Sequence, residues 1–218
     1  METTIIAIDG PSAVGKGTIA RKIAEYYGFE YLDTGIFYRS IAYLTIINKI
    51  SIDEEDKIID IAKKLDIIIR RFSVFYKDEE ITDKIRSNEV NSIVSLISSI
   101  KDVRLIVNEY IRNYVLGKSY VIDGRDITST VFPDAKFKIY LDCDADERAR
   151  RRFKQNQEMG IDCSFEEIYE NLKFRDYNDK TKGYGALTIT SDALIVNTTN
   201  DTIEETINKI INLIGSDL

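Results

Sequence analysis

The chain has 218 residues, 30 Lys and Arg against 37 Asp and Glu, a formal net charge of −7 and no histidine. The length fits one domain or a core with a small insert, and the acidic balance argues against nucleic acid as a partner, because such proteins neutralise phosphates with basic residues. Without histidine, Ser-His-Asp and Cys-His catalysis and His-ligated zinc are excluded.

The start of the chain and its cysteines bear on the cellular compartment. The first residues contain no basic n-region, and nowhere do 18 apolar residues follow one another, so we expect neither a signal peptide nor a membrane span. Cys143 and Cys163 are too few for a disulfide framework. We therefore expect a cytoplasmic protein with no membrane partner.

The first third of the chain alternates short apolar runs with helical periodicity. Strands are predicted over 4–8 and 29–32, and helices over 15–27, 34–48 and 51–65, the last opened by a capping box from Ser51 to Glu54. This alternation predicts a parallel α/β sheet.

The pattern then changes. Two strands, 66–71 and 73–77, have little between them, and helical periodicity follows from about Ser87 to Tyr114. A hairpin inside a strand–helix series predicts an inserted antiparallel subdomain over 65–103.

The alternation resumes in the last hundred residues. Strands are predicted over 120–122, 137–141 and 193–196, and helices over 145–158, 165–178 and 203–214. Capping boxes open the last two helices, with Ser164 and Glu167 in one and Thr202 and Glu205 in the other. The expected fold class is a three-layer α/β core around a five-stranded parallel sheet.

A glycine-rich turn lies between the first strand and the first helix, which is the context of a phosphate-binding P-loop. Its glycines let backbone N–H groups wrap around an anion at a helix N-terminus. The strict pattern has Ser or Thr directly after the lysine. Here Gly17 stands there, so the metal ligand is either Thr18, one place later, or water held by Asp123. The residues expected to bind the phosphates of ATP are Gly10, Pro11, Ser12, Ala13, Val14, Gly15, Lys16, Gly17 and Thr18.

The motifs that distinguish other P-loop proteins are missing. The sequence contains neither the Asn-Lys-x-Asp nor the Asp-x-x-Gly element of GTPase switches, and motors and helicases need far longer chains. A small kinase is the class that remains.

Several further motifs resemble the nucleoside monophosphate kinases, and among them the bacterial cytidylate kinases. They follow in the family's order from residue 5 to residue 198. They are the Gly-Lys-Gly-Thr ending of the P-loop, Leu32–Arg39, Ile122–Asp126 with Val131–Ala135, Asp146–Arg152, and Arg175-Asp176 with Asp179. The insert over 65–103 is also similar to the larger monophosphate-binding insert of that family.

The resemblance implies transfer of the ATP γ-phosphoryl group to CMP or dCMP with Mg²⁺ as cofactor. It implies that Thr34 and Arg39 hold the CMP phosphate, and that Arg175 and Asp179 contact the ribose and the transferred phosphate. The residues that it assigns to the base are Ser95, Arg104 and Asp126. One departure is that Lys180 and Lys182 stand where the family often has arginine, and the two are not equivalent at a bidentate site.

Each further candidate also has a plain structural interpretation. Arg148, Arg151 and Arg152 share one helix face and are predicted to clamp phosphates from a lid over 148–162, although they could form only a solvated charged face. Arg125 and Asp126 lie beyond the carboxyl end of a strand, where α/β sheets bind ligands, but they could simply pair with each other.

Two candidates are also explained by local structure alone. Asp123 could hold magnesium through water or form a simple Asp-Gly turn. Thr34 could bind phosphate, cap a helix, or do both.

From the resemblance we expect an enzyme similar to the cytidylate kinases, which acts as a monomer and binds ATP and CMP or dCMP. Its catalytic residues are expected to be Lys16, Arg148, Arg151, Arg152 and Arg175, and Arg125 is expected to join the CMP site. The alternatives are a P-loop kinase for another small molecule and a nucleotide-sensing binding module.

Overall fold

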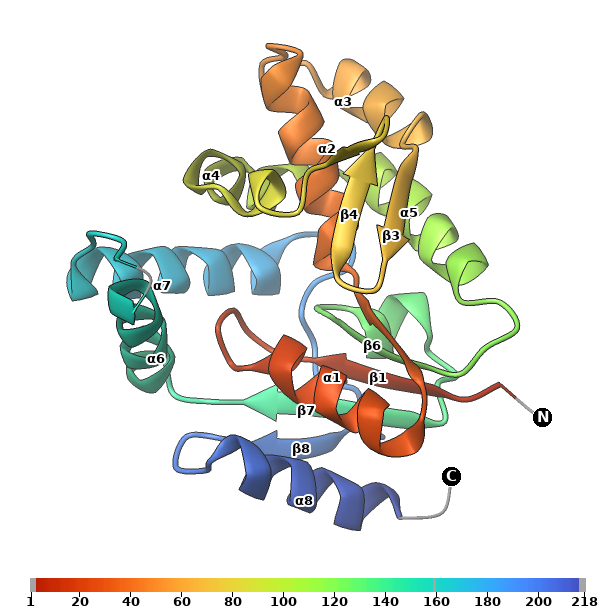
Figure 1. Cartoon of the computed structure of the whole chain (residues 1–218), viewed down its shortest axis with the longest axis vertical. Helices are drawn as coiled ribbons and strands as arrows, with labels where there is room; N and C mark the ends of the chain where they lie inside the picture. Colours follow the sequence, from red (N-terminus) through yellow and green to blue (C-terminus); the bar gives the residue numbers. More distant parts are fainter. Residues whose placement is uncertain (1–2, 159, 216–218) are drawn as a thin grey trace. The chain divides into compact units, whose positions relative to one another are not determined.

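A five-stranded parallel sheet organises the two ends of the chain in the computed structural model, which describes residues 3–158 and 160–215. The chain forms two compact units. The core unit comprises 1–33 and 115–218, and the inserted unit comprises 34–114. Each unit has its own sheet and helices, and each is described separately below (Figure 1).

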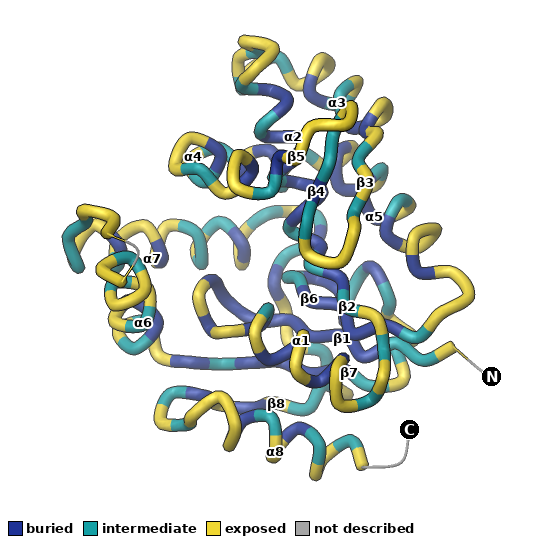
Figure 2. Tube along the Cα trace, viewed as in Figure 1, coloured by how far each residue is buried: buried dark blue, intermediate teal, exposed yellow. Residues whose placement is uncertain are grey.

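The sheet of the core unit confirms the predicted five parallel strands. In the order β2-β6-β1-β7-β8, the strands are β2 (Glu30–Asp33), β6 (Tyr120–Gly124), β1 (Ile5–Asp9), β7 (Phe137–Asp142) and β8 (Leu194–Asn197). The middle strand β1 is buried at Ile6, Ala7 and Ile8 (Figure 2). A parallel strand covered on both faces needs such a continuous apolar run.

Among its described residues, the core unit has the helices α1 (Lys16–Tyr27), α6 (Ala145–Glu158), α7 (Phe165–Thr181) and α8 (Ile203–Ile214). Ile19, Ala20, Ile23 and Ala24 of the first helix are buried, and α1 packs against the sheet and against α8 (Figure 1). A single π-helical turn, Ile127–Val131, follows β6. Both predicted capping boxes form at the starts of α7 and α8.

The inserted unit surrounds a small antiparallel sheet. Its elements are α2 (Gly35–Ile47), α3 (Glu55–Lys63), β3 (Ile67–Arg70), β4 (Ser73–Tyr76), β5 (Glu79–Glu80), α4 (Asn88–Ile97) and α5 (Lys101–Tyr114). Strand β4 lies between β3 and β5, and its Val74 packs with Ile36, Ile81 and Ile85 in a separate apolar cluster. The hairpin and the helical stretch before Tyr114 are as predicted.

Most predicted boundaries are within two residues of the observed ones, and the larger differences are the following. The compact unit runs from Thr34 to Tyr114 rather than over 65–103, because α2 and α5 pack with the elements between them. The helix predicted from Ser51 begins at Glu55, since Glu54 is its N-cap. Helix α7 extends to Thr181, beyond the predicted end at 178.

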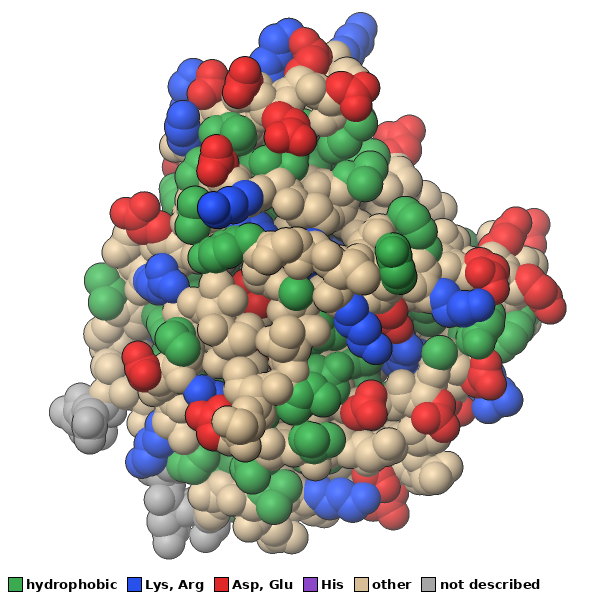
Figure 3. All heavy atoms as spheres, turned by 180° about the vertical axis from the view of Figure 1, so that it is seen from behind, with side chains coloured by type: hydrophobic (Ala, Val, Ile, Leu, Met, Phe, Trp, Pro, Cys, Tyr) green, Lys and Arg blue, Asp and Glu red, His purple; other side chains and the backbone are tan. Residues whose placement is uncertain are grey.

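Other sequence expectations concern the surface and the lid. Among the described residues, no helix is long and apolar enough to cross a membrane. Acidic and basic side chains are interspersed on the face shown in Figure 3. The predicted lid over 148–162 consists of most of α6 and the residues after it, and its Met159 lies outside the described residues.

Candidate active site

The P-loop has the predicted strand–loop–helix context, between β1 and α1. Lys16 is the first residue of α1 and is 7 % exposed. Its ammonium group donates hydrogen bonds to the carbonyl groups of Gly10 (2.8 Å) and Pro11 (2.7 Å). Burial and the nearby charge of Arg125 hold the pKa of Lys16 well below its usual value. The loop therefore curls around a cation that a phosphate group can stabilise.

Gly10 is required by a close backbone approach. A Cβ atom at this position would lie 2.3 Å from the carbonyl oxygen of Leu141 in β7. Such a distance is a clash with backbone, which cannot rotate away as a side chain can. The glycine therefore lets the loop leave β1 directly beside the end of the neighbouring strand.

Ser12 connects the loop to three other parts of the core unit. Its hydroxyl accepts a hydrogen bond from Arg125 Nη2 (2.9 Å), and its carbonyl accepts one from Arg148 Nη1 (2.9 Å). Its backbone N–H donates a long bond to Asp176 Oδ1 (3.4 Å). Asp176 in turn pairs with Arg148 Nη2 at 2.6 Å. The phosphate loop is thus tied to α6, to α7 and to the segment after β6.

Arg125 joins this network to the end of α7. Its Nε donates to Asp179 Oδ2 (2.7 Å), while Lys182 Nζ donates to Asp179 Oδ1 (3.3 Å). Although burial raises the pKa of the Asp179 carboxyl, Arg125 and Lys182 together lower it to about 2. Lys182, where the resembled family often has arginine, therefore contacts the predicted ribose-binding aspartate.

Asp123 is the last residue but one of β6 and lies opposite Asp33 of β2 in the strand register. Burial and the negative charge of Asp33 raise the pKa of Asp123 to about 7. The Tyr31 phenol donates a hydrogen bond to Asp123 Oδ1 (3.2 Å). Burial and the charges of both carboxylates raise the pKa of Tyr31, so its hydroxyl stays protonated and acts as the donor.

Asp9 holds the turn that carries Asp126. Its carboxylate accepts bonds from the backbone N–H of Ile127 (3.0 Å) and from the N–H (2.8 Å) and hydroxyl (2.7 Å) of Thr128. The carbonyl of Asp126 accepts from the N–H of Thr130 (2.8 Å) within the same turn. Burial raises the pKa of Asp9. The last residue of the P-loop strand therefore fixes the residue that the resemblance assigns to the base.

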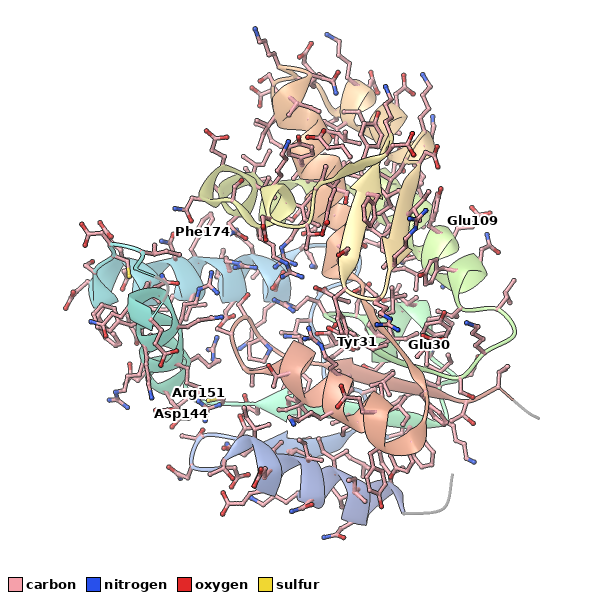
Figure 4. All side chains as sticks on the ribbon, in the orientation of Figure 1. Glu30, Tyr31, Glu109, Asp144, Arg151 and Phe174 are labelled. Atoms are coloured by element: carbon pink, nitrogen blue, oxygen red, sulfur yellow. The ribbon has the colours of Figure 1, made fainter. Side chains whose placement is uncertain are left out.

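The three arginines predicted to act as one clamp lie on α6 as expected, but their side chains go to different places. Arg148 is 4 % exposed and bonded to the loop as described above. Arg151 donates to the carbonyl of Thr198 (2.6 Å) and pairs with Glu147, so it holds the segment after β8 (Figure 4). Arg152 is exposed and donates to Gln155. The three arginines share a helix face but not a binding partner, because Arg148 and Arg151 are hydrogen-bonded to residues of other elements.

The remaining predicted residues are placed as follows. In the core unit, half-buried Arg175 lies on α7 and its charge lowers the pKa of Asp179, while Thr18 is exposed in the first turn of α1. The predicted residues of the inserted unit are Thr34, Arg39, Ser95 and Arg104.

The residues of the inserted unit lie on three helices. Thr34 is the N-cap residue of α2 without a side-chain capping bond, and Arg39 is half-buried on that helix. Ser95 of α4 and Arg104 of α5 are buried. The Arg104 guanidinium lies over the Tyr38 ring at 5.2 Å and donates to the Ser98 carbonyl (3.0 Å). Tyr38 and Ser98, both in the inserted unit, therefore contact the buried Arg104.

Sequence reasoning assigned no role to Asp9, Tyr31 or Asp176. The position of Asp9 at the end of an apolar strand, directly before the P-loop glycine, was a visible signal. For Tyr31 and Asp176 the only signal was that they lie next to motif residues, because their partners come from distant segments of the chain.

The donor set at the end of β6 fits a magnesium ion. Asp123 is a buried carboxylate facing Asp33, and a cation between such groups and phosphate would relieve their repulsion. Among the described residues, no three acidic or cysteine side chains form a closed metal cage. Magnesium is usually held by one or two carboxylates, waters and substrate phosphates rather than by an all-protein cage.

Solved structures show the fold. A gluconokinase from Sinorhizobium meliloti has a TM-score of 0.51 at 10% identity and is matched over 97% of this chain and 91% of its own. A shikimate kinase from Bacteroides thetaiotaomicron has a TM-score of 0.50 at 12% identity, over 96% and 97%. The core sheet with its flanking helices is that of the P-loop kinases.

Sequence comparisons identify the family. The family model described as "Cytidylate kinase" matches residues 6–216. A cytidylate kinase from Caldanaerobacter subterraneus is 39% identical over 95% of this chain and 93% of its own length. One from Alkaliphilus oremlandii is 38% identical over 98% and 99%. The chain belongs to the cytidylate kinase family.

Proposed function

We propose that this chain transfers the γ-phosphoryl group of ATP to the 5′-phosphate of CMP or dCMP. Membership of the family makes it a phosphotransferase, a nucleoside monophosphate kinase. The observation that carries the proposal is the bonding of P-loop Ser12 to Arg125, which also pairs with Asp179. The loop for the donor phosphates is thereby linked to two residues that the resemblance assigns to the acceptor.

The proposed donor site uses the P-loop. Backbone N–H groups of the loop, in which Pro11 has none to donate, and of the start of α1 bind the β- and γ-phosphates, and Lys16 turns from the loop carbonyls to the phosphate oxygens. Asp123 and Thr18 hold Mg²⁺, the former through water. When bound, Mg²⁺ neutralises negative charge on the phosphate oxygens.

The proposed acceptor residues are those that the family resemblance assigns to CMP. Thr34 and Arg39 hold the CMP phosphate, Ser95, Arg104 and Asp126 read the cytosine, and Arg125, Arg175 and Asp179 contact the ribose and the transferred group. Lys182 supports Asp179 in place of an arginine. The CMP phosphate oxygen attacks the γ-phosphorus in line as the bond to the ADP oxygen breaks, and no covalent enzyme intermediate forms.

The proposed mechanism assigns different roles to the positively charged side chains. Lys16 and Arg175 stabilise the equatorial oxygens of the group in flight, because charge is the main requirement of phosphoryl transfer. Arg148 acts by holding Ser12 in place, and Arg151 and exposed Arg152 approach the phosphates only if α6 moves. Movement of the lid over 148–162 is part of the proposal.

The setting of the reaction is also proposed. The cysteines Cys143 and Cys163 are unpaired, which supports a reducing, cytoplasmic compartment. We propose that the protein acts there as a monomer on free nucleotides.

A coupled assay of ADP release tests the function. The purified chain is given ATP and Mg²⁺ with CMP, dCMP, UMP, AMP or GMP. We expect turnover that depends on CMP or dCMP and is far weaker with the purine nucleotides. Faster turnover with another acceptor would replace the proposed substrate, and ATP binding without turnover of any acceptor would favour a nucleotide-sensing module.

A further inference from the structure

Three residues from separate segments meet at the start of α1. They are Gly17 in the first turn of the helix, Tyr31 in β2 and Asp123 at the end of β6. A Cβ atom on Gly17 would lie 3.2 Å from Tyr31 Oη and 3.8 Å from Asp123 Oδ2. Since Tyr31 Oη also bonds Asp123 Oδ1 at 3.2 Å, the phenol occupies the room beside a residue that has no side chain.

The backbone explains how Tyr31 reaches this point. Strands β2 and β6 are paired in parallel, with Asp33 opposite Asp123 and Tyr31 opposite Val121. Alternate residues of a strand face the same side, so Tyr31 projects on the side of the sheet that carries both carboxylates. Its neighbour Glu30 pairs with Lys118 instead (Figure 4).

The Tyr31 ring is held in place by further contacts. The Arg21 guanidinium of α1 lies 5.6 Å from the ring centroid, and the ring packs against the apolar cluster beneath α1. The hydroxyl is therefore delivered to Asp123 by a fixed side chain rather than by a mobile one.

The strict P-loop pattern places a hydroxyl-bearing residue directly after its lysine, where this chain has Gly17. We propose that Tyr31 is a positioning residue which supplies from β2 a hydroxyl that orients the Asp123 carboxylate beside the P-loop. This inference deepens the proposed function, because it rests on Asp123 acting toward the nucleotide-bound magnesium. Hydrogen bonds from second-layer groups commonly set the orientation of such a carboxylate.

Variants can test the role of the Tyr31 hydroxyl separately from that of its ring. Tyr31→Phe keeps the packing and removes one oxygen atom, so a purely structural side chain tolerates it. Gly17→Ser in the wild-type background places its Cβ 3.2 Å from the phenol oxygen, which must give by a few tenths of an ångström, and this is expected to weaken the bond of the phenol to Asp123. When both changes are combined, the phenylalanine leaves room for the serine, whose Oγ can then donate to Asp123 Oδ2.

The test measures binding of Mn²⁺, a paramagnetic substitute for Mg²⁺, to the protein–ADP complex by electron paramagnetic resonance. Each single variant is expected to weaken Mn²⁺ binding roughly tenfold, the lower end for lost outer-layer partners. The double variant is expected to return to within about threefold of wild type, since one hydroxyl has replaced the other. The matched control for Tyr31→Phe is Tyr26→Phe, which removes the hydroxyl of an exposed tyrosine on α1.

Two results would overturn the inference. One is wild-type Mn²⁺ affinity in Tyr31→Phe, and the other is additive loss in the double variant. Thermal unfolding of each variant confirms that it is folded before binding is measured. Wild-type turnover of CMP is measured separately, so that its absence counts against the proposed function while the Mn²⁺ titrations still decide the role of Tyr31.

Discussion

Lys16 shows how a charged side chain is prepared for its ligand. The ammonium is buried against the carbonyls of Gly10 and Pro11, to which its Nζ atom donates hydrogen bonds. Burial disfavours the charged form, so the site gains most when phosphate arrives. The cost of removing this cation from water is therefore part of the free energy of folding and is not added when ATP binds.

Lys16→Met is therefore expected to fold and to lose most of its activity. Removing one charge from the transition state costs on the order of 10²-fold or more in kcat. Steady-state kinetics with ATP and CMP measure the loss, and Lys22→Met, exposed on the same helix, serves as the control. Near-normal turnover in a folded Lys16→Met protein contradicts the assigned role.

Asp126→Ala tests discrimination between cytosine and uracil. A carboxylate accepts a hydrogen bond from the exocyclic amino group of cytosine but meets a carbonyl oxygen on uracil, and sites of this kind discriminate by roughly 10⁴ or more. We expect kcat/KM to fall far more for CMP than for UMP. Exposed Asp134→Ala is the control, and an equal loss for both substrates would mean that Asp126 only orders its turn.

Asp179 gives a pH dependence of stability. Its folded pKa of about 2 lies below the reference value of 3.8, so the unfolded chain binds protons first as pH falls. The stabilisation is present above about pH 4 and is lost between about pH 4 and 2, and it amounts to about 2 kcal/mol at ~1.4 kcal/mol per unit.

Urea unfolding of wild type and Asp179→Asn from pH 6 to pH 2 measures this contribution. The wild-type free energy of unfolding is expected to approach that of the variant as the pH falls. If the difference in the free energy of unfolding between the two proteins stays constant across this pH range, the ion pairs of Asp179 with Arg125 and Lys182 do not stabilise the fold.

The Arg148–Asp176 ion pair joins α6 to α7, and both of its residues are hydrogen-bonded to Ser12 of the P-loop. The Arg148 and Asp176 side chains are only 5 % and 14 % exposed, and Arg148 also donates to the carbonyls of Cys143 and Ser12. A buried cation that loses its partner is far more costly than a surface pair that breaks. The two helices therefore act on the nucleotide loop through Ser12.

Asp176→Asn is expected to destabilise the protein by about 3 kcal/mol, the lower limit for breaking a buried pair, and to weaken ATP binding. Urea unfolding and ATP titration measure the two effects. The control is Glu170→Gln, which removes an exposed pair with Lys173 on the same helix and should change little. Equal effects of the two variants would refute the proposed link.

Local signals predicted the elements better than they predicted side-chain destinations. Ser164 and Thr202 each form the capping box that their own four residues encode. The same pattern at Ser51 does not start a helix, because Glu54 itself takes the N-cap position. The divergence of Arg148 and Arg151 could not be predicted, since their partners, Asp176 and Thr198, become neighbours only after folding.

At the scale of the whole molecule, ligands for the two proposed sites should be separable by thermal stability. A ligand at a hundred times its Kd adds about 2.7 kcal/mol to the free energy of unfolding, which corresponds to a rise in Tm of roughly 5–10 °C for a chain of this size. We expect Lys16→Met to abolish the shift with a non-hydrolysable ATP analogue and to keep the shift with CMP.

Ser95→Ala is the reciprocal variant, expected to reduce the CMP shift and to keep the shift with the ATP analogue. Differential scanning fluorimetry with each ligand measures both. Loss of both shifts in either variant would indicate a general defect instead of separate sites.

The order of strands in the core sheet has a consequence for biosynthesis. Strand β1 lies between β6 and β7, and both follow the whole inserted unit in the chain. At a synthesis rate of about 5–20 residues per second, the apolar strand Ile5–Asp9 leaves the ribosome roughly ten seconds before its neighbours exist. The inserted unit is continuous and can fold during that interval. The nascent P-loop strand is therefore expected to stay unpaired, with its apolar residues uncovered, until β6 and β7 have been made.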